Sequence, residues 1–151
     1  MPGACSYSGL VLDLMTSGRT DDLRFRGLKN MVGNTPLLPV ELSSGKGRLY
    51  LKAEWLNPGG SVKDRAARAI LRDALRRGEL PGKRLLDASS GNTGIAYAML
   101  AAAAGIGVTI CLPANASPER KALLEIYGAE VILTDRLEGT DGAAERAREL
   151  V

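Results

Sequence analysis

Short apolar runs alternate with helical segments over the second half of the sequence. The apolar runs fall at Arg84–Ala88, Gly107–Leu112 and Glu130–Thr134, and the helical segments at Ile95–Ala104, Ser117–Tyr127 and Asp141–Val151. Ser117 is the predicted N-cap of the second helix, with proline after it. Helices of about 10 to 15 residues between short strands are typical of βαβ units, which have parallel strands and right-handed crossovers. We therefore expect an α/β fold with a parallel sheet covered by helices. The helix at Ile95–Ala104 is apolar on nearly every side, which predicts that it is buried between other layers.

The first half of the sequence shows fewer clear elements. Residues 1–30 form an N-terminal arm of mixed composition, in which Gly3, Gly9, Gly18 and the polar group Ser17–Asp22 are predicted as loop, with a short helical turn near Leu10–Met15. Leu37–Val40 is predicted as an edge strand because it contains a proline. The period-two pattern of Arg48–Trp55 predicts another strand.

The composition fits one ordinary globular domain. The chain has 151 residues, of which 45% are hydrophobic and 25% charged, a usual balance for such a domain. The net charge is +3, and basic residues are interleaved with acidic ones. The densest basic group, formed by Arg76, Arg77, Lys83 and Arg84, brackets the predicted end of a helix and is interpreted as a solvated face. We therefore expect no nucleic-acid partner.

Two residue types limit the possible chemistry. Histidine is absent from the sequence, which excludes Ser-His-Asp and Cys-His catalysis and histidine metal sites, and we expect no metal site. Cys5 and Cys111 are far apart, and Cys111 lies in an apolar run, so a buried free thiol in a reducing compartment is expected. No stretch is long and apolar enough to span a membrane, and the start does not resemble a signal peptide. These features predict a cytoplasmic protein without a membrane partner.

The turn at Asn57–Arg65 has the sequence N-P-G-G-S-V-K-D-R and leads into a long helix predicted at Val62–Arg77. Proline followed by two glycines is typical of a turn. Ser61 is the predicted N-cap of the helix, and Asp64 is the predicted acidic partner of a capping box. The motif therefore predicts a sharp turn into a capped helix.

Lys63 occupies an unusual position in the first turn of this helix. The positive end of the helix dipole disfavours a cation there, and helical spacing places Lys63 on one face with Ala66 or Ala67, and with Ile70. Burial on an apolar face favours the neutral amine, which a Schiff-base lysine requires. The alternative is an ordinary lysine whose amine reaches solvent.

A second polar turn, Ser89–Gly94, lies between a predicted strand and the following helix. In a parallel sheet this position is the carboxyl edge, where ligands bind. Two serines, an asparagine, a threonine and backbone N–H groups at a helix N-terminus suit a carboxylate or a phosphate. The sequence matches neither a Walker A loop nor G-x-G-x-x-G. The alternative is a well-capped turn without a ligand.

Together, N-P-G-G-S-V-K-D-R and S-G-N-T-G, the latter at Ser90–Gly94, resemble motifs of the pyridoxal-phosphate enzymes of fold type II. Within them, the chain is most similar to the cysteine synthase (O-acetylserine sulfhydrylase) and cystathionine β-synthase group. Further matching pieces are G-N-T-P-L at Gly33–Leu37, L-P-A-N-A-S-P-E-R at Leu112–Arg120 and Y-G-A-E-V-I-L-T at Tyr127–Thr134. The resemblance covers about residues 31–135 and implies a three-layer fold like that of tryptophan synthase β.

The resemblance implies roles for the matching residues. Lys63 would carry the cofactor, pyridoxal 5′-phosphate, and would later move the α-proton of the substrate. Asn92 would hydrogen-bond the ring hydroxyl oxygen of the cofactor. Ser89, Ser90 and Thr93, together with Asn92, would hold the substrate carboxylate.

The implied reaction is β-replacement on an activated serine, most simply cysteine synthesis from O-acetylserine and sulfide, with the cofactor as electron sink. The alternatives are cystathionine β-synthase or serine/threonine dehydratase activity, and an inactive fragment that acts only as an interaction module. The implied partners are a small amino-acid substrate and, in the full-length family, a second copy in a homodimer. Residues 31–151 would form the N-terminal part of the catalytic domain, with residues 85–134 resembling the mobile subdomain that closes on the substrate.

The sequence departs from the family pattern in two ways. Ser89 stands where most members have threonine, which keeps the hydroxyl and loses a methyl group. The family chain is much longer, and its glycine-rich cup for the cofactor phosphate, of the G-T-G-G-T type, has no counterpart in this sequence. The sequence also ends inside the helix predicted at Asp141–Val151, without a glycine stop signal. We therefore expect a truncated or split copy.

Overall fold

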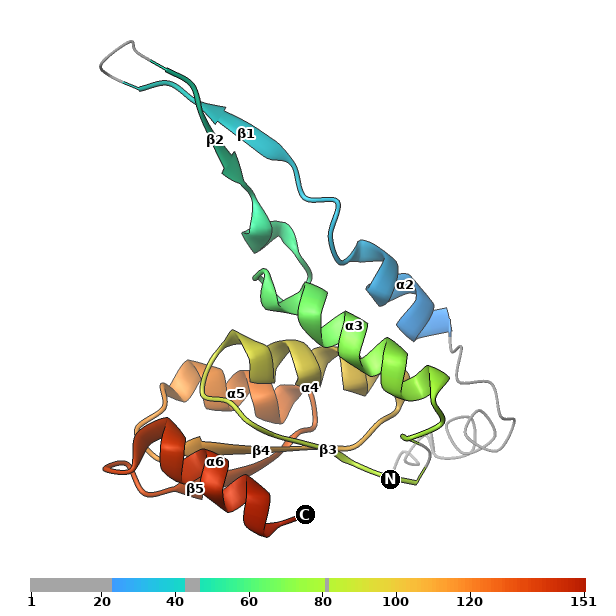
Figure 1. The fold of residues 1–151 in the computed structure, drawn as a ribbon, viewed down its shortest axis with the longest axis vertical. Coiled ribbons are helices and arrows are strands. Elements are labelled where there is room, and N and C mark those ends of the chain that lie inside the picture. Colours follow the sequence, from blue (N-terminus) through green and yellow to red (C-terminus); the bar gives the residue numbers. More distant parts are fainter. Residues whose placement is uncertain (1–22, 43–46, 81) are drawn as a thin grey trace, which may run out of the picture.

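The computed structural model describes residues 23–42, 47–80 and 82–151, with side chains from residue 26 onward. The turn predicted near Leu10–Met15 lies outside these residues. Figure 1 shows a layered body of helices and strands, from which a hairpin projects.

The predicted parallel sheet is confirmed. Its strands are β3 (Leu85–Ala88), β4 (Val108–Pro113) and β5 (Glu130–Thr134), in the order β3-β4-β5 with both pairings parallel. Two helices, α4 (Asn92–Ala104) and α5 (Pro118–Ile126), connect the strands over one face, and α6 (Gly139–Glu149) packs against all three strands from the other (Figure 1). Because all three strands are parallel, the segments that follow them emerge at one carboxyl edge of the sheet.

Helix α4 forms the centre of the body, as its apolar sequence predicts. Every residue from Gly94 to Ala101 is buried. One side of α4 packs on the sheet, where Ala98 meets Ile110 and Leu112. The other side packs on α3 (Lys63–Arg76), where Leu100 belongs to the same cluster as Leu71. The helix therefore connects the sheet to the layer that carries Lys63.

Helix α2 spans Leu23–Met31, a segment for which the sequence predicted no element. Its sequence has a central glycine and no clear apolar stripe, so it lacks the usual pattern of a helix. Its last turn is held by tertiary contacts: Nη1 of Arg68 donates to the backbone oxygens of Lys29 (3.0 Å) and Val32 (2.7 Å). Val32 is buried in the same cluster as α3 and α4. Long-range contacts therefore stabilise a helix that local sequence does not specify.

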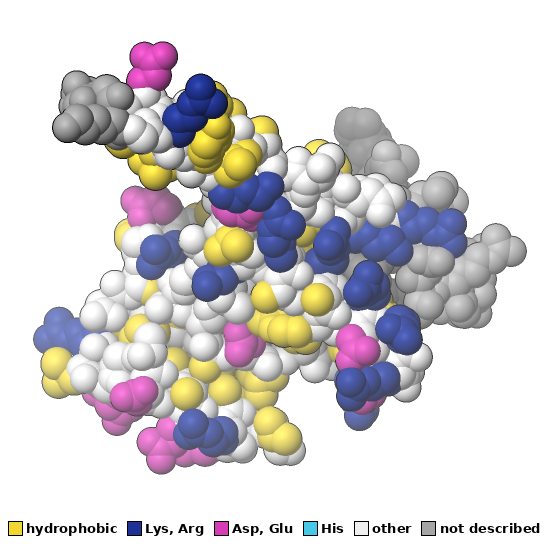
Figure 2. Space-filling model, turned by 45° about the horizontal axis from the view of Figure 1, so that its top comes forward, with side chains coloured by type: hydrophobic (Ala, Val, Ile, Leu, Met, Phe, Trp, Pro, Cys, Tyr) yellow, Lys and Arg dark blue, Asp and Glu magenta, His cyan; other side chains and the backbone are white. Residues whose placement is uncertain are grey.

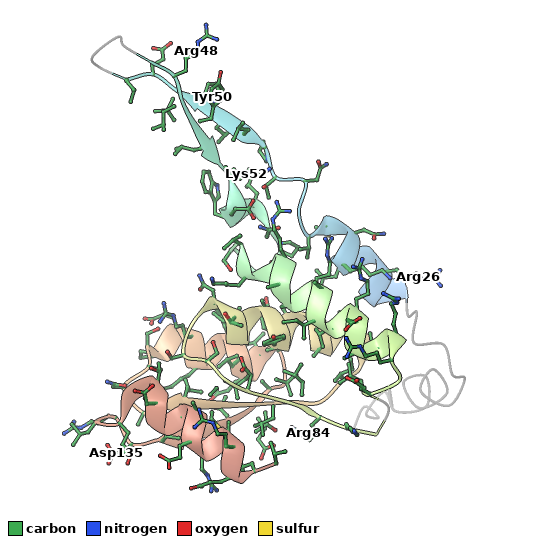
Figure 3. All side chains as sticks on the ribbon, viewed as in Figure 1. Arg26, Arg48, Tyr50, Lys52, Arg84 and Asp135 are labelled. Atoms are coloured by element: carbon green, nitrogen blue, oxygen red, sulfur yellow. The ribbon has the colours of Figure 1, made fainter. Side chains whose placement is uncertain are left out.

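Strands β1 (Leu37–Val40) and β2 (Leu49–Lys52) form an antiparallel hairpin. The second strand is shorter than predicted, because Glu54–Leu56 forms the 3-10 turn η1. Figure 3 shows Arg48 and Tyr50 along the part of the hairpin that extends away from the body. Side chains of Leu37, Leu49 and Leu51 are exposed, and in Figure 2 apolar side chains gather on this projection.

Candidate functional site

The two motifs singled out in the sequence begin neighbouring helices. Lys63 is the first residue of α3 and Asn92 is the first residue of α4. The two helices pack against each other and begin at the same end of the body (Figure 1). That end is the carboxyl edge of the sheet, because Ser89 directly follows β3. The structure thus brings the lysine-bearing turn and the polar turn to one side of the molecule.

Lys63 is exposed, which differs from the predicted burial. The residues that share its face by helical spacing, Ala66 and Ile70, are also exposed. The buried side of α3 is instead formed by Asp64, Ala67 and Leu71. The sequence contains two overlapping apolar stripes, one residue apart, and only contact with α4 decides which is buried. The prediction that Lys63 lies on a buried apolar face was therefore wrong.

The capping box predicted for α3 takes a different form. The Oγ atom of Ser61 accepts a hydrogen bond from the backbone N–H of Lys63 (3.2 Å). The carboxylate of Asp64 accepts one from the backbone N–H of Gly59 rather than of Ser61. Asp64 is fully buried, and burial raises the pKa of its carboxyl. This carboxylate therefore links the Pro58–Gly60 turn to the first turn of α3.

A network of polar side chains holds the approach to this turn, and sequence analysis did not find it. The guanidinium of Arg65 forms two hydrogen bonds to the carboxylate of Glu54, from Nε to Oε2 (2.9 Å) and from Nη2 to Oε1 (2.8 Å). These bonds lower the pKa of Glu54 to about 2. Thr35 and Asn57, both buried, also donate to this carboxylate, each at 2.8 Å. These four residues come from separate segments of the sequence, so no local pattern indicated that they meet.

The polar turn at Ser89–Gly94 is stabilised by its own first residue. The Oγ atom of Ser89 accepts hydrogen bonds from the backbone N–H groups of Gly94 (3.1 Å) and Gly91 (3.4 Å). A Cβ atom at Gly94 would lie 3.0 Å from the backbone oxygen of Ser89, so this close approach requires glycine. Asn92 is exposed, and Ser90 and Thr93 are half-buried. The hydroxyl of Ser89 thus shapes the turn from within, whereas Asn92 is exposed to solvent.

A third matching motif reaches this turn from α5. The predicted cap of α5 is confirmed, since Oγ of Ser117 accepts from the backbone N–H of Arg120 (3.4 Å). The side chain of Arg120 extends to the polar turn, where Nη1 donates to the backbone oxygen of Ser90 (3.2 Å). A cation is therefore placed beside a turn whose N–H groups suit an anion.

Two titratable groups lie in the sheet, the half-buried Asp87 and the buried Cys111. Burial raises the pKa of Asp87, which is in β3 two residues before Ser89. Cys111 in β4 is a fully buried free thiol, as predicted, and burial raises its pKa. A buried thiol with a raised pKa is unreactive, so Cys111 is part of the core.

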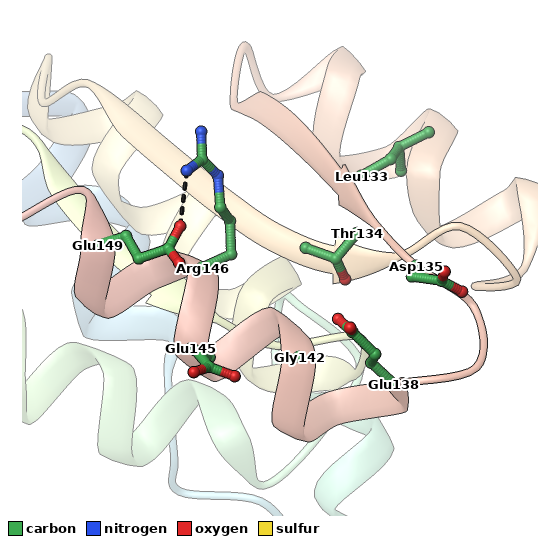
Figure 4. Close-up of a pocket in the computed structure, with 8 residues that line it drawn as sticks. All are labelled: Leu133, Thr134, Asp135, Glu138, Gly142, Glu145, Arg146 and Glu149. Atoms are coloured by element: carbon green, nitrogen blue, oxygen red, sulfur yellow. Dashed lines mark hydrogen bonds and ion pairs between the residues drawn. The ribbon is translucent and has the colours of Figure 1, made fainter.

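A cavity of about 300 Å³ lies between the end of β5 and α6 (Figure 4). Its lining is mainly acidic and includes Asp135, Glu138 and Glu145. Arg146 also lines it and pairs with Glu149 (2.7 Å). Within residues 23–42, 47–80 and 82–151, no group of three or more His, Cys, Asp or Glu side chains is arranged to hold a metal ion. In the same ranges, no helix has the length and apolar character needed to cross a membrane.

Comparison with known families decides the classification. The sequence model of the pyridoxal-phosphate dependent enzyme family matches residues 28–151. The chain belongs to this family. Its match includes α3 with Lys63, the polar turn and α5.

Individual members of the family are clearly similar to the chain. Cysteine synthase of Aquifex aeolicus is 51% identical over 128 residues, which are 80% of this chain and 39% of that protein. Among solved structures, cysteine synthase of Entamoeba histolytica has a TM-score of 0.77 and 36% identity, covering 82% of this chain and 38% of that one. An O-acetylserine dependent cystathionine beta-synthase from Helicobacter pylori has a TM-score of 0.75 and 31% identity, covering 82% and 42%. The chain thus spans about two fifths of the length of these relatives.

The family's cofactor, pyridoxal 5′-phosphate, fits part of this arrangement. Lys63 is exposed, and the apolar side chains of Val62 before it and Ile70 two helical turns after it are 46% and 49% exposed, which leaves apolar surface near the lysine for a planar ring. The polar turn at the start of α4 suits one anion. In the described ranges we find no second turn of this kind that would serve both a cofactor phosphate and a substrate carboxylate. The residues therefore fit the aldehyde and ring of the cofactor, and the phosphate needs donors from elsewhere.

Proposed function

We propose that this chain forms the lysine-bearing part of an enzyme that makes cysteine from O-acetylserine and sulfide. The observation that carries the proposal is the position of Lys63, which is exposed at the start of α3 on the side where the polar turn begins α4. The relatives named cysteine synthase support the choice of reaction. In this proposal the enzyme is cytoplasmic and works as a homodimer.

Each residue of the site has one proposed task. The amine of Lys63 holds the cofactor aldehyde and, once released, takes the proton from the substrate α-carbon. Asn92 donates to the ring hydroxyl oxygen of the cofactor and lies beside the substrate. Ser90 and Thr93 bind the substrate carboxylate together with N–H groups at the start of α4, where the helix dipole favours an anion. Bound cofactor supplies an electron sink for the charge that develops at the α-carbon.

Ser89 has an indirect task in this scheme, because its hydroxyl accepts from the backbone of its own turn. Ser89 therefore keeps the carboxylate-binding N–H groups in place. We further propose that residues 85–134, which include the sheet and both crossover helices, move as a unit when the carboxylate binds. Ser89 holds the shape of the turn by a hydrogen bond within it, and Arg120 of the same unit also contacts the turn. The turn is therefore suited to keep its shape when the unit moves.

The role of Lys63 is tested by trapping. The active enzyme that contains this chain is incubated with pyridoxal 5′-phosphate, reduced with borohydride and mapped by peptide mass spectrometry. We expect the label at Lys63, and a Lys63→Ala variant should fold normally and lose that label, because it removes an exposed side chain. A label found mainly at Lys52 or Lys83 would contradict the assignment.

The similarity to a cystathionine beta-synthase favours a second candidate reaction, in which a thiol-bearing amino acid replaces sulfide. Product analysis of the active enzyme that contains this chain separates the two reactions. Cysteine formed from O-acetylserine and sulfide supports the first proposal. Cystathionine formed from homocysteine, with no cysteine formed from sulfide, would replace it.

A further inference from the structure

We propose that Glu54 and Arg65 are positioning residues that fix the entry to α3 and thereby the direction of the Lys63 amine. This inference rests on the proposed role of Lys63. It concerns two side chains that lie apart from the polar turn and have no proposed contact with substrate. The carboxylate of Glu54 accepts hydrogen bonds from residues at both ends of the turn.

Three residues donate hydrogen bonds to the Glu54 carboxylate. Oε1 accepts from Arg65 (2.8 Å) and from the hydroxyl of Thr35 (2.8 Å), and Oε2 accepts from Arg65 (2.9 Å) and from Nδ2 of Asn57 (2.8 Å). The hydroxyl of Thr35 in turn accepts from Nη2 of Arg65 (3.2 Å). Four donors on one carboxylate leave its orientation little freedom. The low pKa of Glu54, about 2, agrees with this environment.

These donors lie on both sides of Lys63 in the sequence. Asn57 begins the turn and Arg65 ends it, so one carboxylate holds both ends of the segment that contains Lys63. The Oδ1 atom of Asn57 also accepts from the backbone N–H of Gly33 (2.8 Å), which joins the turn to the segment before β1. The G-N-T-P, E-W-L-N and K-D-R stretches thus meet at one group.

The polar side chains next to Lys63 are held by hydrogen bonds, whereas that of Lys63 is exposed. Ser61 and Asp64 are buried, and both hydrogen-bond to backbone N–H groups of the turn. Arg65 is bound to Glu54, whereas the side chain of Lys63 is exposed. A reactive group on a backbone fixed at both sides loses little conformational freedom when it reacts, which increases its effective concentration toward a bound partner.

The test compares two similar pairs in the same chain. Arg84 pairs with Glu130 (3.1 Å), and Thr109 donates to that carboxylate (2.9 Å) and accepts from Arg84 (3.2 Å). This second Arg-Glu-Thr group joins the amino ends of the strands, and Figure 3 shows Arg84 far from the hairpin end of α3. Glu130→Gln is therefore a matched control for Glu54→Gln, because each removes one charge from an Arg-Glu-Thr group.

The measurement, made on the active enzyme that contains this chain, is the ratio of borohydride-trapped pyridoxal phosphate at Lys63 to that at Lys121 of α5. Wild type should favour Lys63, and Glu54→Gln should lower the ratio by about tenfold, as expected when a reacting group is misplaced. Glu130→Gln should leave the ratio unchanged. Amide hydrogen exchange, measured without cofactor, should become faster at Gly59 and Lys63 in Glu54→Gln only.

The outcomes separate this inference from the proposed function. Equal labelling of Lys63 and Lys121 in wild type would overturn the role of Lys63 and its positioning together. A wild-type preference that persists in folded Glu54→Gln would overturn the positioning alone. Should Glu54→Gln fail to fold, Arg65→Lys gives the same comparison, because lysine keeps the charge and cannot form the two-pronged contact.

Discussion

The hydroxyl of Ser89 accepts hydrogen bonds from two N–H groups of its own turn, those of Gly91 and Gly94. Removing it in Ser89→Ala leaves these donors without their side-chain acceptor, as in the loss of a helix cap. We expect the free energy of unfolding to fall by about 0.5–2 kcal/mol, measured by urea denaturation. Ser89→Thr keeps the hydroxyl and should stay within about 0.5 kcal/mol of wild type.

The neighbouring Ser90 and Thr93 provide the contrast for Ser89. Their proposed task is at the substrate, so Ser90→Ala and Thr93→Ala should weaken carboxylate binding by about 1.5–3 kcal/mol, the usual contribution of a hydrogen bond to a charged group. Their effect on unfolding should be smaller than that of Ser89→Ala. Equal destabilisation by all three substitutions, with unchanged amino-acid binding, would assign the whole turn to structure.

The carboxyl of Glu54 predicts a specific dependence of stability on pH. Its pKa is lowered from 4.5 to about 2, chiefly by hydrogen bonding to Arg65. A lowered pKa in the folded state means that the ionised group stabilises the fold above pH 4.5, and that this stabilisation is lost as the pH falls toward about 2. The difference in unfolding free energy between wild type and Glu54→Gln should therefore decrease over this interval.

Two other carboxyls act in the opposite direction and must be separated from Glu54. Burial raises the pKa of Asp64 and Asp87, so each charged form opposes folding, and protonation at lower pH relieves that cost. Both residues are present in wild type and in Glu54→Gln, so their contributions largely cancel in the difference. A difference that stays constant from pH 5 to pH 2 would show that the contact between Glu54 and Arg65 does not affect stability.

At the scale of elements, α3 offers a direct test of which face is buried. Leu71 is fully buried, whereas the adjacent Ile70 is 49% exposed. Leu71→Ala should lower the free energy of unfolding by about 2–5 kcal/mol, and Ile70→Ala should lower it by less than about 1 kcal/mol. The two substitutions remove similar volumes from the same helix, so each is the control for the other. Equal losses would indicate that another surface covers Ile70 in solution.

Some of these elements were predictable from the local sequence, and others were not. Strand β5 has the predicted bounds, Glu130–Thr134, and α5 begins at the predicted cap, because apolar runs and capping residues act locally. The existence of α3 was predicted as well, but its buried face was not, since two apolar stripes of similar strength compete. Helix α2 was missed because contacts from Arg68, distant in sequence, hold its end.

Some features of the candidate site were likewise predictable from the local sequence, and others were not. Motif position identified Lys63 and the Ser89–Gly94 turn, and both occur at helix starts in the structure. The division of work inside the turn was not predictable, because any of its hydroxyls was able to serve as the internal acceptor. The Glu54 carboxylate joins Thr35, Asn57 and Arg65, and nothing in the local pattern of each segment indicates that they meet.

At the scale of the whole molecule, several large apolar side chains are exposed, and the hairpin carries a group of them. Leu37, Leu49, Tyr50 and Leu51 of the hairpin are each between 45% and 58% exposed. A two-stranded hairpin is at best marginally stable in water by itself, and contiguous apolar patches usually mark surfaces that bind other protein. The exposed apolar side chains of the hairpin therefore form a surface that another protein could cover.

These features together predict the behaviour of the 151-residue chain by itself. The cofactor phosphate carries most of the charge of the cofactor, and its desolvation requires several donors. The anion-binding turn at Ser89–Gly94 is already proposed for the substrate carboxylate. We therefore expect weak binding of pyridoxal 5′-phosphate, slow labelling of Lys63, no β-replacement activity, and self-association that increases with concentration. Spectral titration with the cofactor, a cysteine-forming assay and light scattering measure these properties. Tight stoichiometric binding with turnover would show that copies of this chain build a phosphate site between them, and Leu49→Lys with Leu51→Lys should then abolish both if the hairpin forms that contact.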